Sequence, residues 1–516
     1  MTFFVEHAPA LAIAIPLFAA FAMPVAGKAG RRAVLALSLI ASSATLAIVL
    51  VLASSVLSDG IRTYSVGATL PSLTSPAGFP IRIMIEVDAM SALMALISAA
   101  LPLIACLYSA RYMKPGAGLP GYFTLLMLLT AGMIGLVTVG DLFSMFVFLE
   151  ILSVSSGAII AYHSRRGESA EAGLKFVMIS SVGALMVLMA TAFLYGQYNA
   201  LNIAALAGSV RSTGLDMLAL ALLVSAFAMK CGAVPMHMWV ADAYGEAPAP
   251  VSAVLVVGSQ ASLYALFRVC FTIFGASALI HLAGWALIAF GVLSMFIGVT
   301  MAIPQSDIKR LMAYHAVSQT GYMLLGAGVC LSVIGDASAV AAFGQTALQG
   351  GIFHLLNHAL YKGLLFLAAG AIIYRTGTRN INEMGGLARA MPFTALFFII
   401  GMLAIAGLPP FNGFASKLMI YESVFMLNPL LSVVAMAVSV LTLASFVKVF
   451  CAAFLGPPAA GQRGLSEVPL AMRIAMGVLA FFIILLGLMP GLAVDGIVAP
   501  AASALLDRLS YIGGVI

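Results

Sequence analysis

Three charged residues stand inside long apolar stretches of the sequence, where an ionised side chain finds no polar partner nearby in the sequence. Glu150 occurs in DLFSMFVFLEILSVSSGAII, nine residues after Asp141. Lys230 occurs in LLVSAFAMKCGAVPMHMWV, and Lys417 occurs in GLPPFNGFASKLMIY. Because a charge near the centre of a bilayer costs several kcal/mol, such residues are functional candidates by default. A structural ion pair, or a side chain that snorkels to the membrane surface, is the alternative for each.

A second group of candidates forms a helical series, His354, His358 and Lys362, in HLLNHALYKGLLFL. Steps of four residues place all three on one helix face. The two histidines have the spacing of a helical zinc pair, but no Glu follows His354 and no third ligand is evident, so we expect no metal. Imidazole titrates near neutral pH and hydrogen-bonds in both forms, which favours a proton relay.

Four further residues are secondary candidates: Lys175, His237, Lys309 and His315. The two lysines lie near predicted helix ends, where snorkelling is as good an explanation as transport. The two histidines either extend the relay or are core histidines with satisfied hydrogen bonds.

Prolines interrupt two of the predicted helices close to a candidate lysine. Pro235 follows Lys230 by five residues, and Pro409 and Pro410 precede Lys417. The backbone groups freed by these prolines find no partner in lipid, so the breaks must face protein or a wet cavity. A matched pair of interrupted helices is typical of inverted repeats with an ion site at the membrane midplane. A kink without a functional role is the alternative.

The elements that must position these residues are apolar helices. Of 516 residues, 63% are hydrophobic and only 8% are charged, against about a quarter charged in a soluble domain. Apolar stretches of about 20 residues span a bilayer, and they recur along the whole chain. The expected spans are 8–27, 33–57, 88–110, 122–140, 142–163, 172–195, 214–240, 249–275, 279–303, 307–333, 340–374, 392–424, 428–455 and 469–490.

This pattern predicts an all-α integral membrane protein of about fourteen transmembrane helices. Helices 4–8 and 9–13 make two five-helix units, with the broken helices 7 and 12 in matching positions. Because five is odd, the second unit is inverted relative to the first. The predicted organisation is 1–120 for helices 1–3 with an extracytoplasmic loop, 121–275 and 276–455 for the two repeats, and 456–516 for the last helix and a tail.

Basic residues in the loops predict the orientation. The longest polar break, about 58–87, is expected to fold over the membrane surface, and the opposite set of loops carries most of the charge. These basic residues are Lys28, Arg31, Arg32, Arg111, Lys114, Arg165, Arg166, Lys309, Arg310, Arg375, Arg379, Arg389, Arg463 and Arg473, whereas mainly Arg62, Arg82 and Arg211 lie in the other loops. The positive-inside rule then places both termini outside the cytoplasm. The N-terminal stretch lacks the basic region of a cleavable signal and is read as a retained helix.

Several function classes find no support in the sequence. The net charge of +6 is explained by cytoplasmic loops rather than by nucleic acid. The five cysteines occur singly without CxxC spacing and are read as packing residues: Cys106, Cys231, Cys270, Cys330 and Cys451. No iron–sulfur or haem pattern, nucleotide loop or nucleophile–base pair is evident, so we expect no cofactor and no catalytic centre.

Several motifs together resemble the antiporter-like membrane subunits of respiratory complex I, Mrp sodium/proton antiporters and group 4 hydrogenases. They are DLFSMFVFLE, PMHMWVADAYGEAPAPVSA, DIKRLMAYHAVSQTGY, NHALYKGLLFLAAGAIIYRTGTR and GLPPFNGFASK, in the expected order over about 85–425. The amino-acid sequence around 314–322 and 354–379 most resembles that of the Mrp D subunit and of its hydrogenase counterparts. The resemblance implies that Glu150, Lys230 and Lys417 match the family's functional residues of helices 5, 7 and 12, and that His358 lies in its helix 11 motif.

One position departs from the family pattern. The resemblance implies a lysine four residues before the tyrosine of a Tyr-x-x-x-Arg ending in helix 8. Here the ending is Tyr264 to Arg268, and the matching position is Gln260. Glutamine holds water but does not titrate, which puts in doubt the usual link between the two half-channels.

These observations favour a proton-translocating subunit, with sodium/proton antiport as one form of it, in a multisubunit complex of the cell inner (cytoplasmic) membrane. The expected partners are other membrane subunits, including homologous ones, and lipid. In the expected mechanism Glu150 and Lys230 form an ion pair, and a neighbouring subunit that withdraws Glu150 makes Lys230 release its proton through the histidines toward Lys417. A stand-alone secondary transporter and a non-pumping scaffold subunit remain as alternatives, and Gln260 lends weight to the second.

Overall fold

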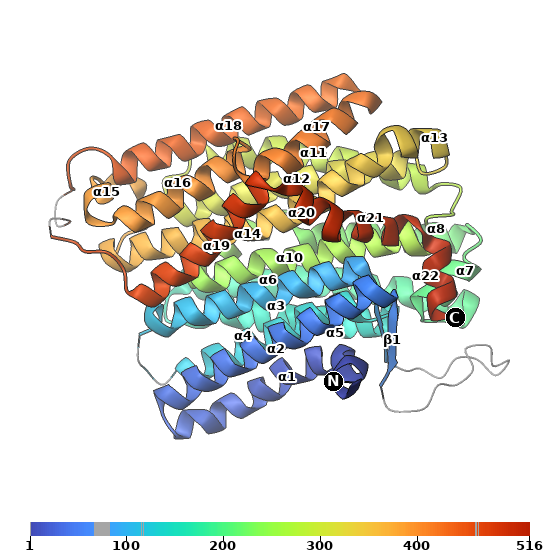
Figure 1. The fold of residues 1–516 in the computed structure, drawn as a ribbon, viewed down its shortest axis with the longest axis horizontal. Helices are drawn as coiled ribbons and strands as arrows, with labels where there is room; N and C mark the ends of the chain where they lie inside the picture. Colours follow the sequence, from blue (N-terminus) through green and yellow to red (C-terminus); the bar gives the residue numbers. More distant parts are fainter. Residues whose placement is uncertain (1, 67–82, 115, 117, 460–461, 463) are drawn as a thin grey trace.

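The protein is a bundle of long helices (Figure 1). The computed structural model describes residues 2–66, 83–114, 116, 118–459, 462 and 464–516. A helix satisfies its backbone hydrogen bonds within one segment, so it is the form in which apolar chains cross lipid. The expectation of an all-helical membrane architecture is confirmed by the long apolar helices.

The first part of the chain contains α1 (Thr2–Lys28), α2 (Arg31–Asp59), β1 (Arg62–Ser65), β2 (Met84–Val87), α3 (Ala89–Tyr112), α4 (Leu119–Thr138), α5 (Leu142–Ile160), α6 (Gly167–Tyr198), α7 (Ile203–Ser209), α8 (Gly214–Cys231), α9 (Met238–Glu246) and α10 (Ala249–Phe267). The second part contains α11 (Ile280–Ala302), α12 (Ile308–Ser332), α13 (Ala337–Ala339), α14 (Gln345–Thr376), α15 (Leu387–Ala390), α16 (Pro392–Ala406), α17 (Asn412–Leu427), α18 (Pro429–Phe454), α19 (Leu470–Leu488), α20 (Pro490–Ala493), α21 (Ala499–Leu506) and α22 (Arg508–Val515).

Twelve helical segments among the described residues are long and apolar enough to cross a membrane. The helix α12 is not one of them although it has 25 residues, because it carries many polar side chains. The half-helices α16 and α17, with 15 and 16 residues, are too short to be counted singly. The difference from the expected fourteen therefore concerns these elements.

Both proline-containing stretches interrupt their helices. The half-helix α8 ends at Cys231 and α9 begins at Met238, while α16 ends at Ala406 and α17 begins at Asn412. Each first half ends on a glycine, Gly232 or Gly407, with a φ of +77°. This left-handed conformation favours glycine, because a side chain clashes there. The peptide bonds before Pro235 and Pro410 are cis.

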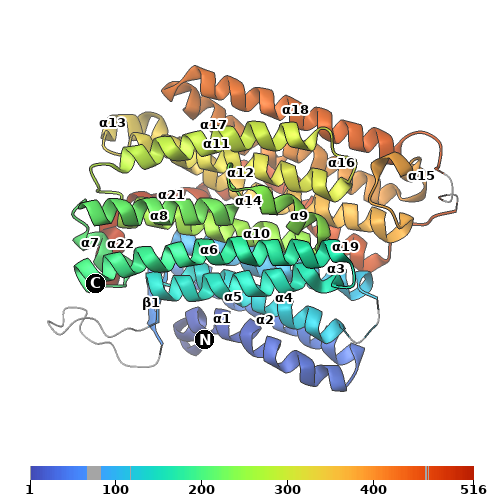
Figure 2. The ribbon, with the colours of Figure 1, turned by 180° about the vertical axis from the view of Figure 1, so that it is seen from behind.

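Two helices form the buried centre of the bundle. The most apolar window of the segment that contains α10 is buried throughout, and α14 packs against α10, α12, α16 and α17. Figure 2 shows α6 and α8 side by side on the opposite face. Most side chains on α10 and α14 are thereby shielded from lipid, as polar groups inside a membrane require.

One end of the bundle differs from expectation. Part of the predicted surface loop 58–87 is an antiparallel hairpin in which Arg62 of β1 pairs with Val87 of β2; residues 67–82, including Arg82, lie outside the described residues, as does Arg463. The expected C-terminal tail contains the further helices α20, α21 and α22. Near the start of α1, His7 hydrogen-bonds Tyr64 of β1. We call this the hairpin end.

Candidate functional site

Lys230 lies in the last turn of α8 with its ammonium held by a hydroxyl group. Its Nζ donates to Ser153 Oγ of α5 at 2.5 Å, and the residue is 7% exposed. Glu150 lies one turn before Ser153 on the same helix, and its Oε1 has no hydrogen-bond partner in the described part of the chain. The expected direct ion pair is not formed: no Glu150 oxygen is within 4.0 Å of Lys230 in the structure described. Lys230 is instead held one turn away from the carboxylate.

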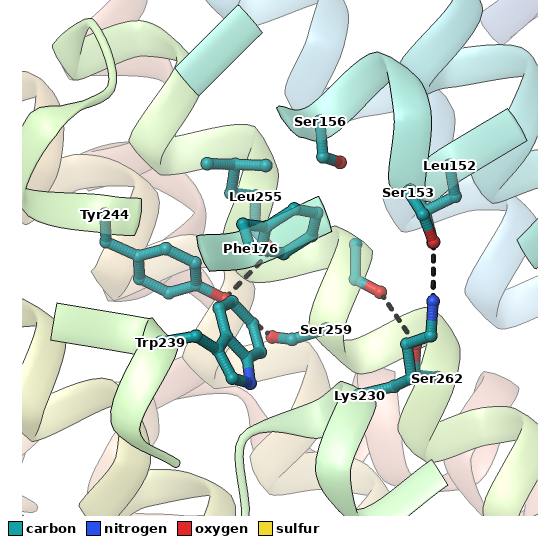
Figure 3. Close-up of a pocket in the computed structure, with 11 residues that line it drawn as sticks. Leu152, Ser153, Ser156, Phe176, Lys230, Trp239, Tyr244, Leu255, Ser259 and Ser262 are labelled. Carbon is teal, nitrogen blue, oxygen red and sulfur yellow. Dashed lines mark hydrogen bonds between the residues drawn. The ribbon is translucent and has the colours of Figure 1, made fainter. Parts of the chain in front are cut away.

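A small cavity lies beside Lys230 (Figure 3). Its volume is about 20 Å³, which is room for a single water molecule. On the wall of the cavity, the Tyr244 hydroxyl donates a hydrogen bond of 3.0 Å to Ser259 Oγ. The lining is rich in hydroxyl groups: Ser153, Ser156, Tyr244, Ser259 and Ser262. These hydroxyl groups are able to hydrogen-bond a water molecule next to Lys230.

Gln260, at the position of the expected family lysine, joins α10 to α14. Its Nε2 donates to His358 Nδ1 at 2.8 Å and to Leu355 O at 2.9 Å. Both residues are buried, and Gln260 Oε1 and His358 Nε2 have no partner among the described residues. The amide thus holds His358 as an acceptor at Nδ1, with two polar atoms left to bind water.

His354 lies at the centre of a buried hydrogen-bond network. Its Nδ1 is 3.0 Å from Ser416 Oγ of α17, and its Nε2 is 3.2 Å from Gln319 Oε1 of α12. Tyr361 places its hydroxyl 3.1 Å from the same Nε2. Both ring nitrogens are therefore used, which orients the imidazole toward the broken helix α17.

Lys417 caps the first half of the second broken helix. Its Nζ donates to Ile405 O at 2.8 Å and to Ser439 Oγ at 2.7 Å. The carbonyl belongs to the last turn of α16, where the helix dipole favours a cation. Lys417 is 1% exposed and also lies over the Tyr322 ring. A side chain at Gly407 would collide with Lys417, since its Cβ would lie 2.7 Å from Lys417 Cδ.

Lys362 is fully buried on the same face of α14 as the histidines. Its Nζ donates to Met312 O at 2.6 Å and lies over the rings of Phe366 and Phe446. His315 stacks against Phe446 and shares a hydrogen bond of 2.9 Å with Ser445 Oγ. The two residues form a side group next to the row that contains His354 and His358.

The other secondary candidates lie elsewhere. Lys175 is half exposed and pairs with Glu171 at 2.6 Å and with Asp242 at 3.3 Å. Lys309 is buried and donates to Gly245 O at 3.0 Å and to Ala247 O, at the end of α9. Both belong to the end of the bundle that carries the basic loops. His237 precedes α9, and its Nδ1 has no partner among the described residues.

The basic-loop end also has an open polar hollow of about 580 Å³. On the wall of this hollow, Arg379 forms ion pairs with Glu246 at 3.0 Å and with Asp307 at 2.6 Å. Arg310 and Glu168 line the same hollow. Water therefore has access to the ends of α9 and α12 from this side.

Sequence reasoning missed the groups that hold the candidates in place. Ser153, Gln319, Ser416 and Ser439 each contact a candidate, but a serine or glutamine in an apolar helix carries no cost that singles it out. It also missed the buried pair Asp88–Arg268, with an Nη2–Oδ1 distance of 2.6 Å. Arg268 carries the same signal as Lys230, a charge in an apolar stretch, and this signal could have identified it.

The comparisons with known proteins agree with this architecture. The profile of the family described as "NADH:quinone oxidoreductase/Mrp antiporter, TM" matches residues 139–442. The chain belongs to this family of multi-pass, antiporter-like membrane subunits, which confirms the resemblance read from the sequence. The fold is shared over nearly the whole chain with subunits of two solved complexes, and curated relatives come from three kinds of assembly.

Among curated relatives, "NADH-quinone oxidoreductase subunit N" of Desulforudis audaxviator is 32% identical over 90% of both chains. "Hydrogenase-4 component B" of Escherichia coli is 31% identical over 82% of this chain and 65% of its own length. The D subunit of a Na(+)/H(+) antiporter from Alkalihalophilus pseudofirmus is 35% identical over 65% of both chains. The chain thus matches less than two thirds of the length of the last two relatives.

Two solved structures superpose on nearly the whole chain. One is the Mrp complex from Dietzia sp. DQ12-45-1b, with a TM-score of 0.86, 27% identity and 99% coverage of both chains. The other is the membrane-bound sulfane sulfur reductase, an archaeal respiratory membrane complex, with a TM-score of 0.87, 28% identity and 98% coverage of this chain and 99% of the other.

Proposed function

We propose that the protein is a proton-translocating subunit of a multisubunit membrane complex. The observation that carries this proposal is a row of buried polar groups that crosses the bundle, from Lys230 through Gln260, His358 and His354 to Lys417. No carboxylate forms an ion pair with either lysine in the described part of the chain. A buried ammonium held only by neutral groups gives up its proton far more readily than a paired one.

In the proposed path two pairs of side chains are in direct contact, and water molecules bridge the remaining distances. His358 contacts Gln260, and His354 contacts Ser416, the residue before Lys417. The cavity beside Lys230 supplies the first water position, between α8 and α10. Glu150 controls the start of the path: when its carboxylate approaches Lys230 it stabilises the ammonium, and when it withdraws the proton leaves.

Fourteen crossings in two inverted five-helix repeats complete the proposed architecture. The twelve counted segments, together with α12 and the pair α16–α17, make fourteen. The second helix of each proposed repeat begins with an aspartate that caps the helix and bridges an asparagine: Asp141 with Asn202, and Asp307 with Asn380. The proposed boundaries of the repeats remain 121–275 and 276–455.

The two proposed repeats are not chemically equal. Lys230 precedes its break, in α8, whereas Lys417 follows its break, in α17. Lys417 therefore caps carbonyl groups of the opposite half-helix, while Lys230 is held by a neighbouring helix. We infer that the proton arrives at Lys230 under the control of Glu150 and that Lys417 serves the second half-channel.

The proposed setting is the cytoplasmic membrane, with both termini outside the cytoplasm and the basic-loop end inside. Other membrane subunits, homologous ones among them, and lipid are the proposed partners, because the two similar solved structures come from an Mrp complex and a respiratory membrane complex. The driving energy then comes from electron-carrying partners or from an opposing sodium gradient.

The test is the variant Lys230→Met, assayed for proton transport in the assembled complex in vesicles. We expect transport to fall by about a hundredfold, the scale of losing one proton-transfer group, with assembly intact. Lys28→Met, the same substitution at an exposed helix end, is the matched control and should transport normally. Transport by an assembled Lys230→Met complex at the control rate contradicts the proposal.

A scaffold subunit that does not pump is the second candidate, because Gln260 does not titrate. It predicts that Lys230→Met, Lys417→Met and the unchanged protein all support the same transport by the whole complex. The pumping subunit predicts a loss in both variants. Activity of the isolated chain in vesicles would instead favour a stand-alone transporter.

A further inference from the structure

A carboxyl group that the proposed path does not use is buried at the hairpin end of the bundle. Glu86 of β2 is 1% exposed. Its Oε1 accepts a hydrogen bond of 2.5 Å from Asn202 Nδ2, and its Oε2 accepts one of 2.6 Å from the Tyr511 hydroxyl of α22. No cation lies within ion-pair distance of Glu86 among the described residues.

The backbone packs closely against Glu86 on the side of Gly140. A Cβ atom at Gly140 would lie 2.0 Å from Glu86 Cδ, so only glycine allows the carboxyl to sit there. The nearest cation, Arg268, is committed to Asp88 at 2.6 Å and lies over the Tyr511 ring at 4.8 Å. The charged and titratable groups of the elements around this end are Asp88, Asp141, Tyr264, Arg268, Asp507, Arg508 and Tyr511, with Arg62 and Tyr64 on β1 and Glu6 and His7 on α1.

The balance of these groups lets Glu86 take up and release protons near neutral pH. Burial raises the pKa of Glu86 to about 7, and the hydrogen bonds from Tyr511 and Asn202 oppose this rise. The Asp141 carboxylate raises the same pKa further, while Arg268 lowers it.

A row of polar side chains connects this end to the centre of the bundle. Gln260, Tyr264 and Arg268 follow one another at steps of four along α10 and its π-helical continuation Arg268–Ile273, so they share one face. The Tyr264 hydroxyl is 2.7 Å from Ser91 Oγ and 3.2 Å from Arg268 Nη2. The stretch of helix from Gln260 to Arg268 spans about 12 Å along its axis.

We propose that Glu86 is a proton-binding site at the end of a branch that leaves the central row at Gln260 and His358 and follows α10 to the hairpin end. The inference rests on the proposed transport function and adds an outlet that does not pass Lys417. In the transfer step the Glu86 carboxylate forms an O–H bond with a proton delivered by water, and it later returns that proton to water at the hairpin end. The Asp88 carboxylate neutralises Arg268, so the branch holds no unpaired cation that would repel the proton.

The C-terminal segment holds this site. Tyr511 supplies one of the two hydrogen bonds to Glu86, and Arg508 of the same helix α22 donates to Thr272 O at 3.2 Å and to Ala207 O. Tyr511 is a positioning residue: its hydroxyl donates to the ionised carboxylate and sets the pH at which the carboxylate takes its proton.

The experiment is infrared difference spectroscopy of the assembled complex across a pH series, followed by proton transport in vesicles. We expect the carbonyl band of a protonated carboxyl that titrates near neutral pH, absent from Glu86→Gln. The matched control is Asp59→Asn, an exposed carboxylate at the same end, which should keep the band and full transport. Transport by Glu86→Gln should fall by about tenfold, less than the hundredfold scale of a lost proton-transfer group, because the outlet through Lys417 remains.

Tyr511→Phe separates a proton site from a structural one. Loss of the hydroxyl removes a hydrogen bond that favours the ionised form, so the band should titrate at higher pH while the ring contacts remain. Unchanged titration in Tyr511→Phe together with normal transport by Glu86→Gln overturns the branch. If Lys230→Met transports at the control rate, the transport function itself fails, and the Glu86 band alone then decides whether the carboxyl binds a proton.

Discussion

Gln260 Nε2 donates to His358 Nδ1 at 2.8 Å, and this contact joins α10 to the histidine-bearing helix α14. A lysine is implied at this position by the family pattern, and the glutamine replaces its charge with a neutral donor. The imidazole is thereby oriented without a neighbouring ammonium. In the proposed path, the centre of the row therefore relies on His358 and water for proton transfer.

Gln260→Lys tests whether the site is adapted to a neutral side chain. An ammonium there reaches the same two acceptors, Leu355 O and His358 Nδ1, but it lies near Lys230 without a carboxylate to balance it. Like charges in a medium of low dielectric repel strongly, so we expect an assembled complex with reduced transport. Proton pumping across a pH series is the measurement. Unchanged activity with an unchanged pH optimum would show that the position tolerates a charge.

Lys417→Met should block the second half-channel. The substitution removes the proton carrier and leaves Ile405 O and Ser439 Oγ without their donor, at a cost of about 1–3 kcal/mol for each buried group. Transport should be lost, and the thermal stability of the complex should fall. Ser439→Ala is the partner variant: it keeps the lysine and one of its hydrogen bonds, so it should slow transport far less. Equal losses in the two variants would assign Lys417 a structural role.

Labelling of single cysteines tests the orientation of the bundle. Arg310→Cys lies at the basic-loop end and Leu509→Cys at the hairpin end; both positions are exposed. The exposed native thiol of Cys451 is first replaced by serine. We expect an impermeant reagent applied from outside the cell to label Leu509→Cys and to spare Arg310→Cys. The reverse pattern would overturn the topology.

Glu86 should make the stability of the protein depend on pH. Its pKa is raised from 4.5 to about 7 in the folded protein, so the folded state binds the proton more tightly than the unfolded state. The resulting stabilisation is complete below pH 4.5 and is lost as pH rises through 7, a change of about 3 kcal/mol for such a shift.

Thermal unfolding of the purified complex at pH 5, 6, 7 and 8 measures this dependence, and Glu86→Gln should flatten it. Asp59→Asn serves again as the control, because its carboxylate is exposed. A curve for Glu86→Gln that is as steep as that of the control would mean that another group accounts for the dependence.

The membrane helices and the buried row follow from the sequence because both rest on large energies. Twenty apolar residues have few folds open to them in lipid, and a lysine such as Lys230 or Lys417 in such a segment is conspicuous. The breaks in the helices could be predicted equally well, because proline removes a backbone hydrogen-bond donor. In the structure α8 ends at Cys231, four residues before Pro235. The local sequence does not define the end of this helix more precisely than the proline does.

Contacts between distant parts of the chain could not be predicted from the sequence in this way. Asp88 and Arg268 are 180 residues apart, and Glu86 and Tyr511 are 425 residues apart. Nothing in the local pattern of either segment specifies the other. The hairpin of β1 and β2 could not be predicted either, because a four-residue strand shows too little periodicity to detect. Lys230 contacts Ser153 rather than the expected Glu150, one helical turn further along α5, and the sequence does not show which turn of α5 faces α8.

The contact between Tyr511 and Glu86 can form only late in the synthesis of the protein. Glu86 enters the membrane region with the first helices, but its second hydrogen-bond donor is translated 425 residues later. Until residues 508–515 dock, the carboxyl has only Asn202 as a partner. A chain that stops short of Arg508 therefore lacks the hydrogen bond from Tyr511 that completes the surroundings of Glu86 at the hairpin end.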